Sequence, residues 1–426
     1  MLKQIRRKIY NSSKIIGDRF GFDLPYYVEN GFWLSLSKII ELAFGVAISV
    51  FFARFTTLEI YGQYNLLISI LAILSILSAP GLSVSALRAV AKGNHGVYKK
   101  AVNLRFIWSL TGIPLLLLIG LLYFYFDSKA MSYSILASAL LFPLFYSVSS
   151  WPIIFQGKEK FNKFSKFEVI RVILSSSLII GVIYLGVESI FPVFITYLIV
   201  NSALNFIFYF LSLKEIENDK IDNVWKSSGY KLTFLKFISL AYDYIDKLII
   251  GFFLGPEKLA VYAIAVGISS YLRQINGIAT RVIMPKLFKI SKNYFKDIFK
   301  KLLAIFSLSS VLVSILMFFI LPFLITFLYS NKYFESIFYA QLYLITIPFY
   351  SISTIYQLGM IYLEEETDLS KIKIFSIIIN LILYFILIPY FELVGAIVAS
   401  VIYFLILDII FVFKFKKIYK YKLSNK

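Results

Sequence analysis

Charged residues lie inside three apolar stretches that are long enough to cross a membrane. At helix-centre depth each costs at least about 2.5 kcal/mol, so such residues normally face a cavity or a charged partner. Cationic groups there could hold an anion, and arginine is the better bidentate partner for phosphate. Carboxylates there could exchange a proton or Na⁺. The residues are Lys38 and Glu41 in one stretch, Asp243, Asp246 and Lys247 in a second, and Arg273 in a third.

The spacing of these charges leaves two interpretations open. Lys38 and Glu41 are three residues apart, and Asp243 and Lys247 four apart, so each couple could be an intrahelical ion pair that only neutralises itself. Asp246 is then left over, and Arg273 has no acid within a helical turn, which favours a functional role for both. Arg54, at the end of the first stretch, fits either an anchor at the membrane surface or an additional anion contact.

Twelve apolar stretches follow one another along the chain. A bilayer core about 30 Å thick needs roughly 20 apolar residues in a helix, and most of the stretches meet that length. Prolines inside five of them (Pro80, Pro114, Pro143, Pro322 and Pro348) predict kinks. The predicted spans are 31–53, 63–87, 104–126, 131–155, 167–186, 189–213, 233–254, 259–281, 302–328, 336–362, 372–389 and 393–413.

Lysine and arginine are concentrated at the two ends of the chain and around alternate gaps between these spans, and these clusters hold 36 of the 43 cationic residues. Cytoplasmic loops carry such an excess, so the pattern places both termini in the cytoplasm with an even number of crossings. The sequence therefore predicts an all-α, multi-pass protein of the cytoplasmic (inner) membrane with about 12 transmembrane helices. The net charge of +19 is explained by this orientation signal, and we expect no nucleic-acid partner.

Several classes of function are disfavoured by what the sequence lacks. It has no G-x-x-x-x-G-K-[ST] phosphate loop, which argues against an ATP-driven pump. With no cysteine and one histidine, His95 in an inner loop where we expect it to face solvent, neither a catalytic residue nor a metal site or cofactor is predicted. The predicted outer loops are too short for a membrane glycan polymerase or ligase of the usual kind.

The twelve spans divide into two groups of six. We predict a basic N-terminal arm (1–30), a first six-helix bundle (31–213), a linker (214–232), a second bundle (233–413) and a basic tail (414–426). Phe52–Tyr64 and Phe253–Tyr262 occupy equivalent places in the two bundles, and in both a Glu precedes a Tyr by five residues. Such parallel repeats are found in some secondary transporters, whose binding site lies between the halves.

The same segments resemble the polysaccharide flippases of the multidrug/oligosaccharidyl-lipid/polysaccharide (MOP) transporter superfamily. The resemblance runs from about residue 30 to 415. It is carried by Ala241–Ala265 (AYDYIDKLIIGFFLGPEKLAVYAIA), Ala53-Arg54 with Glu59-x-Tyr61-Gly62, Gly81-Leu82-Ser83 with Arg88, Met284-Pro285-Lys286, and Asn380, Ile388-Pro389 and Gly395-Ala396.

This resemblance implies a two-bundle exporter that moves a polyprenyl-(pyro)phosphate-linked oligosaccharide to the outer leaflet by alternating access. Lys38, Lys247, Arg273 and Arg54 are then candidate substrate contacts, and Glu41, Asp243 and Asp246 candidate sites for H⁺ or Na⁺ coupling. We expect a monomer surrounded by membrane lipids. A multidrug or peptidoglycan-precursor exporter of the same superfamily remains an alternative, because fold alone does not fix the substrate.

Overall fold

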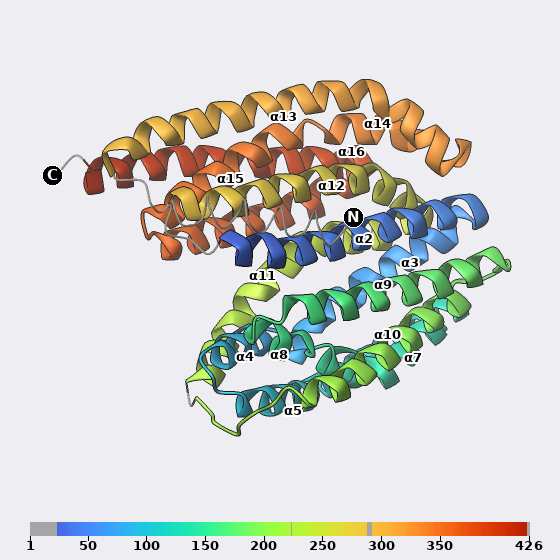
Figure 1. The fold of residues 1–426 in the computed structure, drawn as a ribbon. Helices are drawn as coiled ribbons and strands as arrows, with labels where there is room; N and C mark the ends of the chain where they lie inside the picture. Colours follow the sequence, from blue (N-terminus) through green and yellow to red (C-terminus); the bar gives the residue numbers. More distant parts are fainter. Residues whose placement is uncertain (1–23, 223, 288–291, 424–426) are drawn as a thin grey trace, which may run out of the picture. The chain divides into compact units, whose positions relative to one another are not determined.

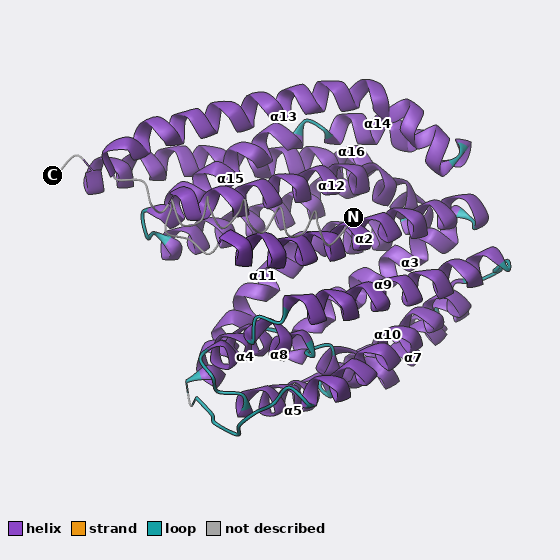
Figure 2. Cartoon of the chain, in the orientation of Figure 1, coloured by secondary structure: helices purple, strands orange, loops and turns teal. Residues whose placement is uncertain are grey.

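The computed structural model describes residues 24–222, 224–287 and 292–423, and within these ranges the chain is helical, without a β-strand (Figure 2). Most of the predicted basic arm, and the last three residues of the predicted basic tail, lie outside the described residues. The all-α fold class predicted from the sequence is confirmed.

Nine helical segments of the described chain are long and apolar enough to span a membrane, so this is a multi-pass membrane protein. The count of twelve crossings and the side on which the termini lie remain predictions. The nine segments are Gly31–Phe55, Leu58–Ser78, Gly96–Tyr125, Lys129–Gly157, Phe161–Tyr184, Ile190–Leu213, Tyr294–Tyr329, Glu335–Tyr362 and Thr367–Tyr419.

Three further predicted spans are accounted for by particular helices. Helix α11 (Trp225–Phe253) and helix α12 (Gly255–Leu287) coincide with the predicted seventh and eighth spans, but their charged and polar residues keep them out of the nine. Helix α16 (Glu366–Leu423) consists of two arms that meet at Glu392, which has a φ of 50°. A β-carbon on Gly395 would lie 2.2 Å from the carbonyl oxygen of Leu387, so this reversal of the chain requires glycine. The two arms match the predicted spans 372–389 and 393–413.

The chain folds into two compact units, each with its own core (Figure 1). The first unit comprises residues up to Ile48 and Leu74–Lys236, with Trp151 and Trp225 buried in its core. Its elements are the first part of α2 (Leu24–Phe55), η1 (Ser75–Ser78), α4 (Gly81–Ala91), α5 (Gly96–Ser109), α6 (Gly112–Tyr125), α7 (Lys129–Val148), α8 (Pro152–Gly157), α9 (Phe161–Tyr184), α10 (Ile190–Leu213) and the start of α11.

The second unit comprises Ser49–Ile73 and the chain from Phe237 onward, with Phe299 stacked on Phe415 and Phe295 tilted against Phe299 in its core. Because residues 49–73 group by contact with this unit, the compact units divide the chain differently from the predicted bundles, whose bounds stay a prediction. Its elements are the end of α2, α3 (Leu58–Leu74), the rest of α11, α12, α13 (Lys292–Tyr329), η2 (Asn331–Tyr333), α14 (Glu335–Tyr343), α15 (Thr346–Tyr362) and α16.

Several spans that read as continuous in sequence are broken in the structure. Pro80 caps α4, Pro114 lies in the first turn of α6, and Pro348 in the first turn of α15, so these three prolines begin new helices. Pro143 and Pro322 lie inside α7 and α13. At three of the five positions where the sequence predicts a kink, the proline therefore lies at the start of a new helix.

A buried arginine stabilises two of the breaks in the first unit. Arg105 is 5% exposed; its Nε donates to the Ser78 carbonyl oxygen (3.1 Å) and its Nη2 to the Ser78 hydroxyl (3.0 Å). Its Nη1 donates to the hydroxyls of Ser83 (2.9 Å) and Ser150. Ser78 and Ser150 lie where α3–η1 and α7 have just ended, so the guanidinium faces helix C-termini, which carry partial negative charge.

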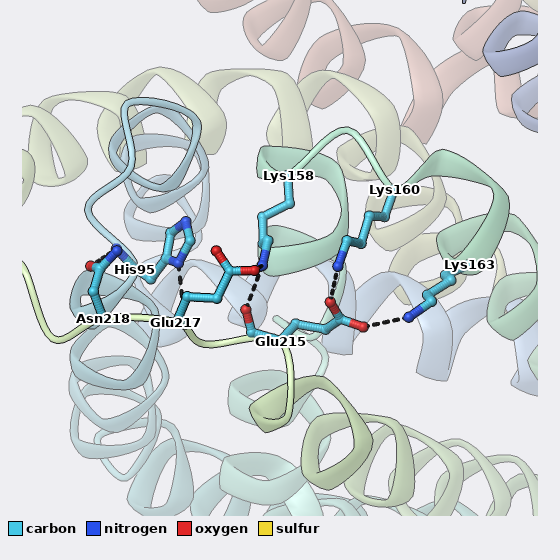
Figure 3. A network of polar contacts seen from close by, with 7 residues as sticks. All are labelled: His95, Lys158, Lys160, Lys163, Glu215, Glu217 and Asn218. Carbon is cyan, nitrogen blue, oxygen red and sulfur yellow. Dashed lines mark hydrogen bonds and ion pairs between the residues drawn. The ribbon is translucent and has the colours of Figure 1, made fainter.

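The linker that follows α10 is fixed to the first unit (Figure 3). Lys160 and Lys163 pair with the carboxylate of Glu215, and Lys158 pairs with Glu217. Main-chain contacts add to these pairs, since the N–H of Glu217 donates to His95 Nδ1 (3.3 Å). The expectation that His95 faces solvent is wrong: it is 6% exposed, because the linker covers it.

Candidate functional site

Lys38 and Glu41 form an ion pair within α2. Lys38 Nζ lies 3.0 Å from Glu41 Oε1, and the two side chains are 42% and 44% exposed. The i, i+3 spacing allowed either an intrahelical ion pair or two charges in a cavity, and the structure shows that the ion pair forms. An ion pair that remains this exposed along a membrane-spanning helix still requires a polar environment, so neutralisation and a place in a wet cavity are compatible.

A second ion pair, which the sequence analysis missed, lies on α9. Arg171 donates from Nε to Glu168 Oε2 (3.1 Å) and from Nη2 to Glu168 Oε1, and its Nη1 donates to Asn201 Oδ1 (2.9 Å). Glu41 of α2 is close enough to interact electrostatically with this guanidinium. Arg171 lies near the start of the predicted span 167–186, whereas α9 begins ten residues before it, at Phe161.

Asp246 is a buried, hydrogen-bonded acid of α11. It is 6% exposed, its Oδ2 accepts a hydrogen bond from the Tyr262 hydroxyl (2.8 Å), and its Oδ1 accepts one from the Lys247 main-chain N–H (2.8 Å). Lys247 Nζ lies 3.6 Å from the same Oδ1 and donates to the main-chain carbonyl of Asp243 (2.7 Å). The lysine is therefore nearer to the carboxylate of Asp246 than the sequence spacing suggested, and it lies 5.2 Å from the ring centre of Tyr244.

Asp246 is linked through Tyr384 to polar groups on both arms of α16. Tyr384 interacts electrostatically with Asp246, and its hydroxyl lies 2.9 Å from the Ser400 hydroxyl. Asn380 hydrogen-bonds Tyr384, while its own buried Oδ1 has no hydrogen-bond partner among the described residues. Oxygen atoms of carboxylates, hydroxyls and amides are the ligand types that a hard cation prefers; a coupling role of Asp246 stays a prediction.

Arg273 lies among tyrosines of the second unit. Its Nη1 donates to the Tyr343 hydroxyl (3.2 Å), and its guanidinium carbon lies 5.3 Å from the Tyr343 ring centre. Tyr242 and Tyr350 are also close enough to interact with it electrostatically. Within the described chain Arg273 makes no ion pair, so its positive charge is held by phenol groups and the faces of aromatic rings.

Arg54 is occupied by a helix end. Its Nε donates to the carbonyl oxygen of Leu328 (2.9 Å) and its Nη2 to that of Phe327, the last turn of α13. A cation there satisfies carbonyls that lack an intrahelical partner. This geometry fits the anchor interpretation, and a contact of Arg54 with substrate stays a prediction.

The predicted site residues are thus distributed over both units. Lys38 and Glu41 belong to the first unit, and Arg54 and the α11 and α12 residues to the second. That they line one cavity remains a prediction. Tyr262 ends one of the two related motifs, but nothing in the sequence marks it as a partner of Asp246, and nothing distinguishes Tyr343 among 31 tyrosines. A helix start at Phe161 would have placed Arg171 well inside α9.

Comparison with models of protein families shows the family to which this chain belongs. The family model described as "Polysaccharide biosynthesis protein" matches residues 27–291, more than half of the chain. The chain belongs to this family. The resemblance to polysaccharide flippases stated from the motifs is therefore confirmed at family level, while no curated protein matches the chain by sequence.

Solved structures show that this family member has the MOP superfamily fold. "Lipid II flippase MurJ, inward closed conformation" is 16% identical with a TM-score of 0.66, and the match covers 90% of this chain and 88% of that one. An inward-facing multidrug resistance MATE transporter is 12% identical with a TM-score of 0.66, covering 92% and 99%. A MOP transporter from Pyrococcus furiosus is 10% identical with a TM-score of 0.59, covering 92% and 96%. All three are transporters or flippases by title.

Proposed function

We propose that this protein moves a polyprenyl-(pyro)phosphate-linked oligosaccharide, the repeat unit of a surface polysaccharide, from the cytoplasmic to the outer leaflet by alternating access. Membership of the polysaccharide biosynthesis family supports the substrate class. The observation that carries the proposal is Arg273, a cation inside a helix at the predicted membrane depth with no ion-pair partner in the described chain. Such a charge is retained at a cost, and a transported anion would compensate it.

The substrate contacts follow from charge. A pyrophosphate head group is anionic and cannot cross hydrocarbon unaided, so Arg273 would bind it through two parallel N–H groups, and Lys38 and Lys247 as point charges. Arg54 would help only where its hold on the end of α13 is released. This protein would act as a monomer in the cytoplasmic membrane, with twelve crossings and both termini in the cytoplasm.

The driving ion would be H⁺ or Na⁺. Glu41, Asp243 and Asp246 are the proposed coupling acids. Asp246 is favoured among them because it is buried, is contacted by Tyr262, and interacts with Tyr384, whose partner Asn380 has a buried amide oxygen without a partner within the described residues. Binding of a cation at Asp246 would also weaken its attraction for Lys247 at 3.6 Å, which would free that lysine for the head group.

Substitution of Arg273 tests the flippase proposal. Cells carrying Arg273→Ala should stop exporting surface polysaccharide and accumulate the glycolipid in the cytoplasmic leaflet, at an unchanged protein level. Arg273→Lys should retain part of the activity, because it keeps the charge but loses the paired donors. Lys129→Ala, which removes an exposed lysine at the start of α7, is the matched control. Normal export with Arg273→Ala would remove Arg273 from the site.

Export of drugs is the second candidate function, supported by the similarity of the fold to MATE transporters. Such substrates are often cationic, and a site that holds Arg273 and Lys247 would repel them. If the protein is a drug exporter, its expression should raise resistance to cationic amphiphiles, and its deletion should leave surface polysaccharide intact. A peptidoglycan-precursor lipid, by analogy with the MurJ title, would differ in the group that its pyrophosphate carries.

A further inference from the structure

Two pairs of opposite charges lie inside membrane-spanning helices of the first unit. Arg171 and Glu168 are on α9, and Lys38 and Glu41 are on α2. Arg171 is ten residues from the start of α9, which places it about 15 Å along the helix axis. Both helices belong to segments that are apolar enough to cross a membrane, so all four charges lie within predicted membrane-spanning segments.

The guanidinium of Arg171 is held in a fixed orientation. Glu168 accepts two of its hydrogen bonds and Asn201 a third. Asn201 is itself fixed, since its amide donates to the Ser175 hydroxyl (2.7 Å) and the Tyr197 carbonyl (2.9 Å). Arg171 has five N–H groups, and two of them have no partner in the described chain. An oriented guanidinium with two remaining donors is suited to a phosphate.

The two pairs are close enough to act together. Glu41 interacts electrostatically with Arg171 across the two helices, and Lys166 of α9 lies 5.8 Å from the ring centre of Trp33 on α2. The other groups that face Arg171 are Tyr197 and Asn201 of α10. The charges of the four residues sum to zero, so the cluster is balanced when no ligand is bound.

The cluster is also accessible. The exposed fractions are 42% for the side chain of Lys38, 44% for Glu41, 27% for Arg171 and 16% for Glu168. Exposure of such charges to hydrocarbon would cost several kcal/mol, so this part of the α2 and α9 surface must face water.

We propose that Lys38, Glu41, Glu168 and Arg171 form a phosphate-binding site that takes up protons when the anion binds; it deepens the flippase function proposed above, on which it rests. A phosphate that binds Arg171 and Lys38 displaces their carboxylates. Each displaced carboxylate then lies beside an anion instead of a cation, and it binds a proton from the aqueous phase more readily. No covalent bond other than the new O–H changes. With two protons on Glu41 and Glu168, a doubly charged pyrophosphate is carried in a neutral cluster, which links substrate and proton.

Binding measurements on the purified full-length protein test this site. The probe is farnesyl pyrophosphate, and farnesol, with the same chain and no charge, is the reference ligand. Calorimetry in two buffers with different ionisation enthalpies gives the affinity and the number of protons taken up. Glu168→Gln imitates the protonated acid and releases Arg171, so it should bind about tenfold tighter and take up fewer protons. Arg171→Gln should bind about tenfold weaker.

Two further variants keep the test decisive. Arg171→Gln leaves Glu168 without its cation, so the double variant Glu168→Gln/Arg171→Gln, which stays neutral, should fold and should show the same weak binding. Lys163→Gln, an exposed lysine of the same helix that pairs with the linker, should bind like the wild type.

The results separate this site from the flippase function. An affinity and proton uptake of Glu168→Gln equal to the wild type, together with weakened binding in Arg273→Ala, would overturn the α2–α9 site and leave the flippase proposal standing. If the wild type binds farnesyl pyrophosphate no better than farnesol, both proposals fail.

Discussion

Gly62 lies directly against the main chain of Pro256. A β-carbon built on Gly62 would be 1.7 Å from the Pro256 carbonyl oxygen, so the backbones of α3 and α12 are in contact within the second unit. Both residues belong to the pair of motifs that echo each other in the sequence, one after the first span and one after the seventh. The two motifs that carry the family resemblance therefore also pack on one another.

Replacing Gly62 by alanine should destabilise the second unit. The added methyl group would meet main-chain atoms, which cannot move aside as a flexible side chain can, and overpacking of this kind costs about 1–3 kcal/mol. The melting temperature of the purified protein should fall by several degrees. Gly267→Ala in α12 is the control, since a β-carbon there meets nothing within 4 Å. Equal melting temperatures for the two variants would contradict the contact.

Removing the hydroxyl of Tyr343 should weaken transport without abolishing it. Tyr343→Phe deletes the acceptor that orients Arg273 at 3.2 Å but keeps the ring beside the guanidinium. One hydrogen bond to a cation is worth about 1.5–3 kcal/mol if its loss is not compensated, so the export rate should fall about tenfold. Tyr339→Phe removes a hydroxyl on the same helix that donates to Glu335, and it should leave export normal. A normal rate in Tyr343→Phe would show that Arg273 needs no such support.

Neutralising the acids of α11 should uncouple transport from its ion gradient. The double variant Asp243→Asn/Asp246→Asn removes both carboxylates near Lys247, so neither H⁺ nor Na⁺ would have a charged ligand there. Flipping in proteoliposomes under imposed pH and Na⁺ gradients should no longer depend on either gradient. Asp127→Asn, at an exposed turn, serves for comparison. An unchanged gradient dependence would refute the coupling role of both acids.

Acid should loosen the linker from the first unit. Burial lowers the pKa of His95 from its ordinary value of 6.5, and the charge of Lys158 lowers it further. Neutral His95 accepts the hydrogen bond of Glu217 through Nδ1, whereas protonated His95 cannot. Because the folded pKa lies below the unfolded one, this contact contributes its full stability above about pH 6.5 and loses it as the pH falls through the folded pKa.

The carboxylate of Glu215 should release its lysines only in stronger acid. Burial alone would raise its pKa, but hydrogen bonds from Lys160 and Lys163 outweigh burial and lower it. The chain has no cysteine, so a spin label on Lys220→Cys reports the linker alone. Its mobility should rise between about pH 8 and about pH 5, and it should rise less in His95→Gln. The same rise in both proteins would exclude His95 as the sensor.

The membrane-spanning segments were predictable because each is a long, continuous run of apolar residues. The predicted span 189–213 matches α10 at Ile190–Leu213, and the predicted outer gap at 389–393 contains Glu392, where α16 reverses. The breaks inside spans were less predictable. The chain stays apolar through Leu344 and Ile345, where α14 gives way to α15, so the hydropathy pattern does not register the break.

The charged residues of the candidate site were predictable only in part, because sequence shows a charge inside an apolar stretch but does not show its partners. A lone arginine or an acidic pair inside an apolar run is visible in sequence, which identified Arg273 and Asp246. Partners from distant segments are not visible, so Tyr343 and Tyr262 were missed. Arg171 and Glu168 lie inside the predicted span 167–186, but close to its start and directly after several basic residues, whereas α9 already starts at Phe161. His95 was expected in solvent because nothing in its own loop predicts the segment that covers it.

Helix α11 leaves the first unit and enters the second between Lys236 and Phe237, in mid-helix. Its first turns are packed on α4, where Gly229 and Gly81 allow the two backbones to touch. Because α11 is one continuous helix from Trp225 to Phe253, the two units are connected here by a helix and not by a flexible linker. A proline near the middle of α11 would break this helix and make the connection less stiff. It would leave the charged side chains described above unchanged.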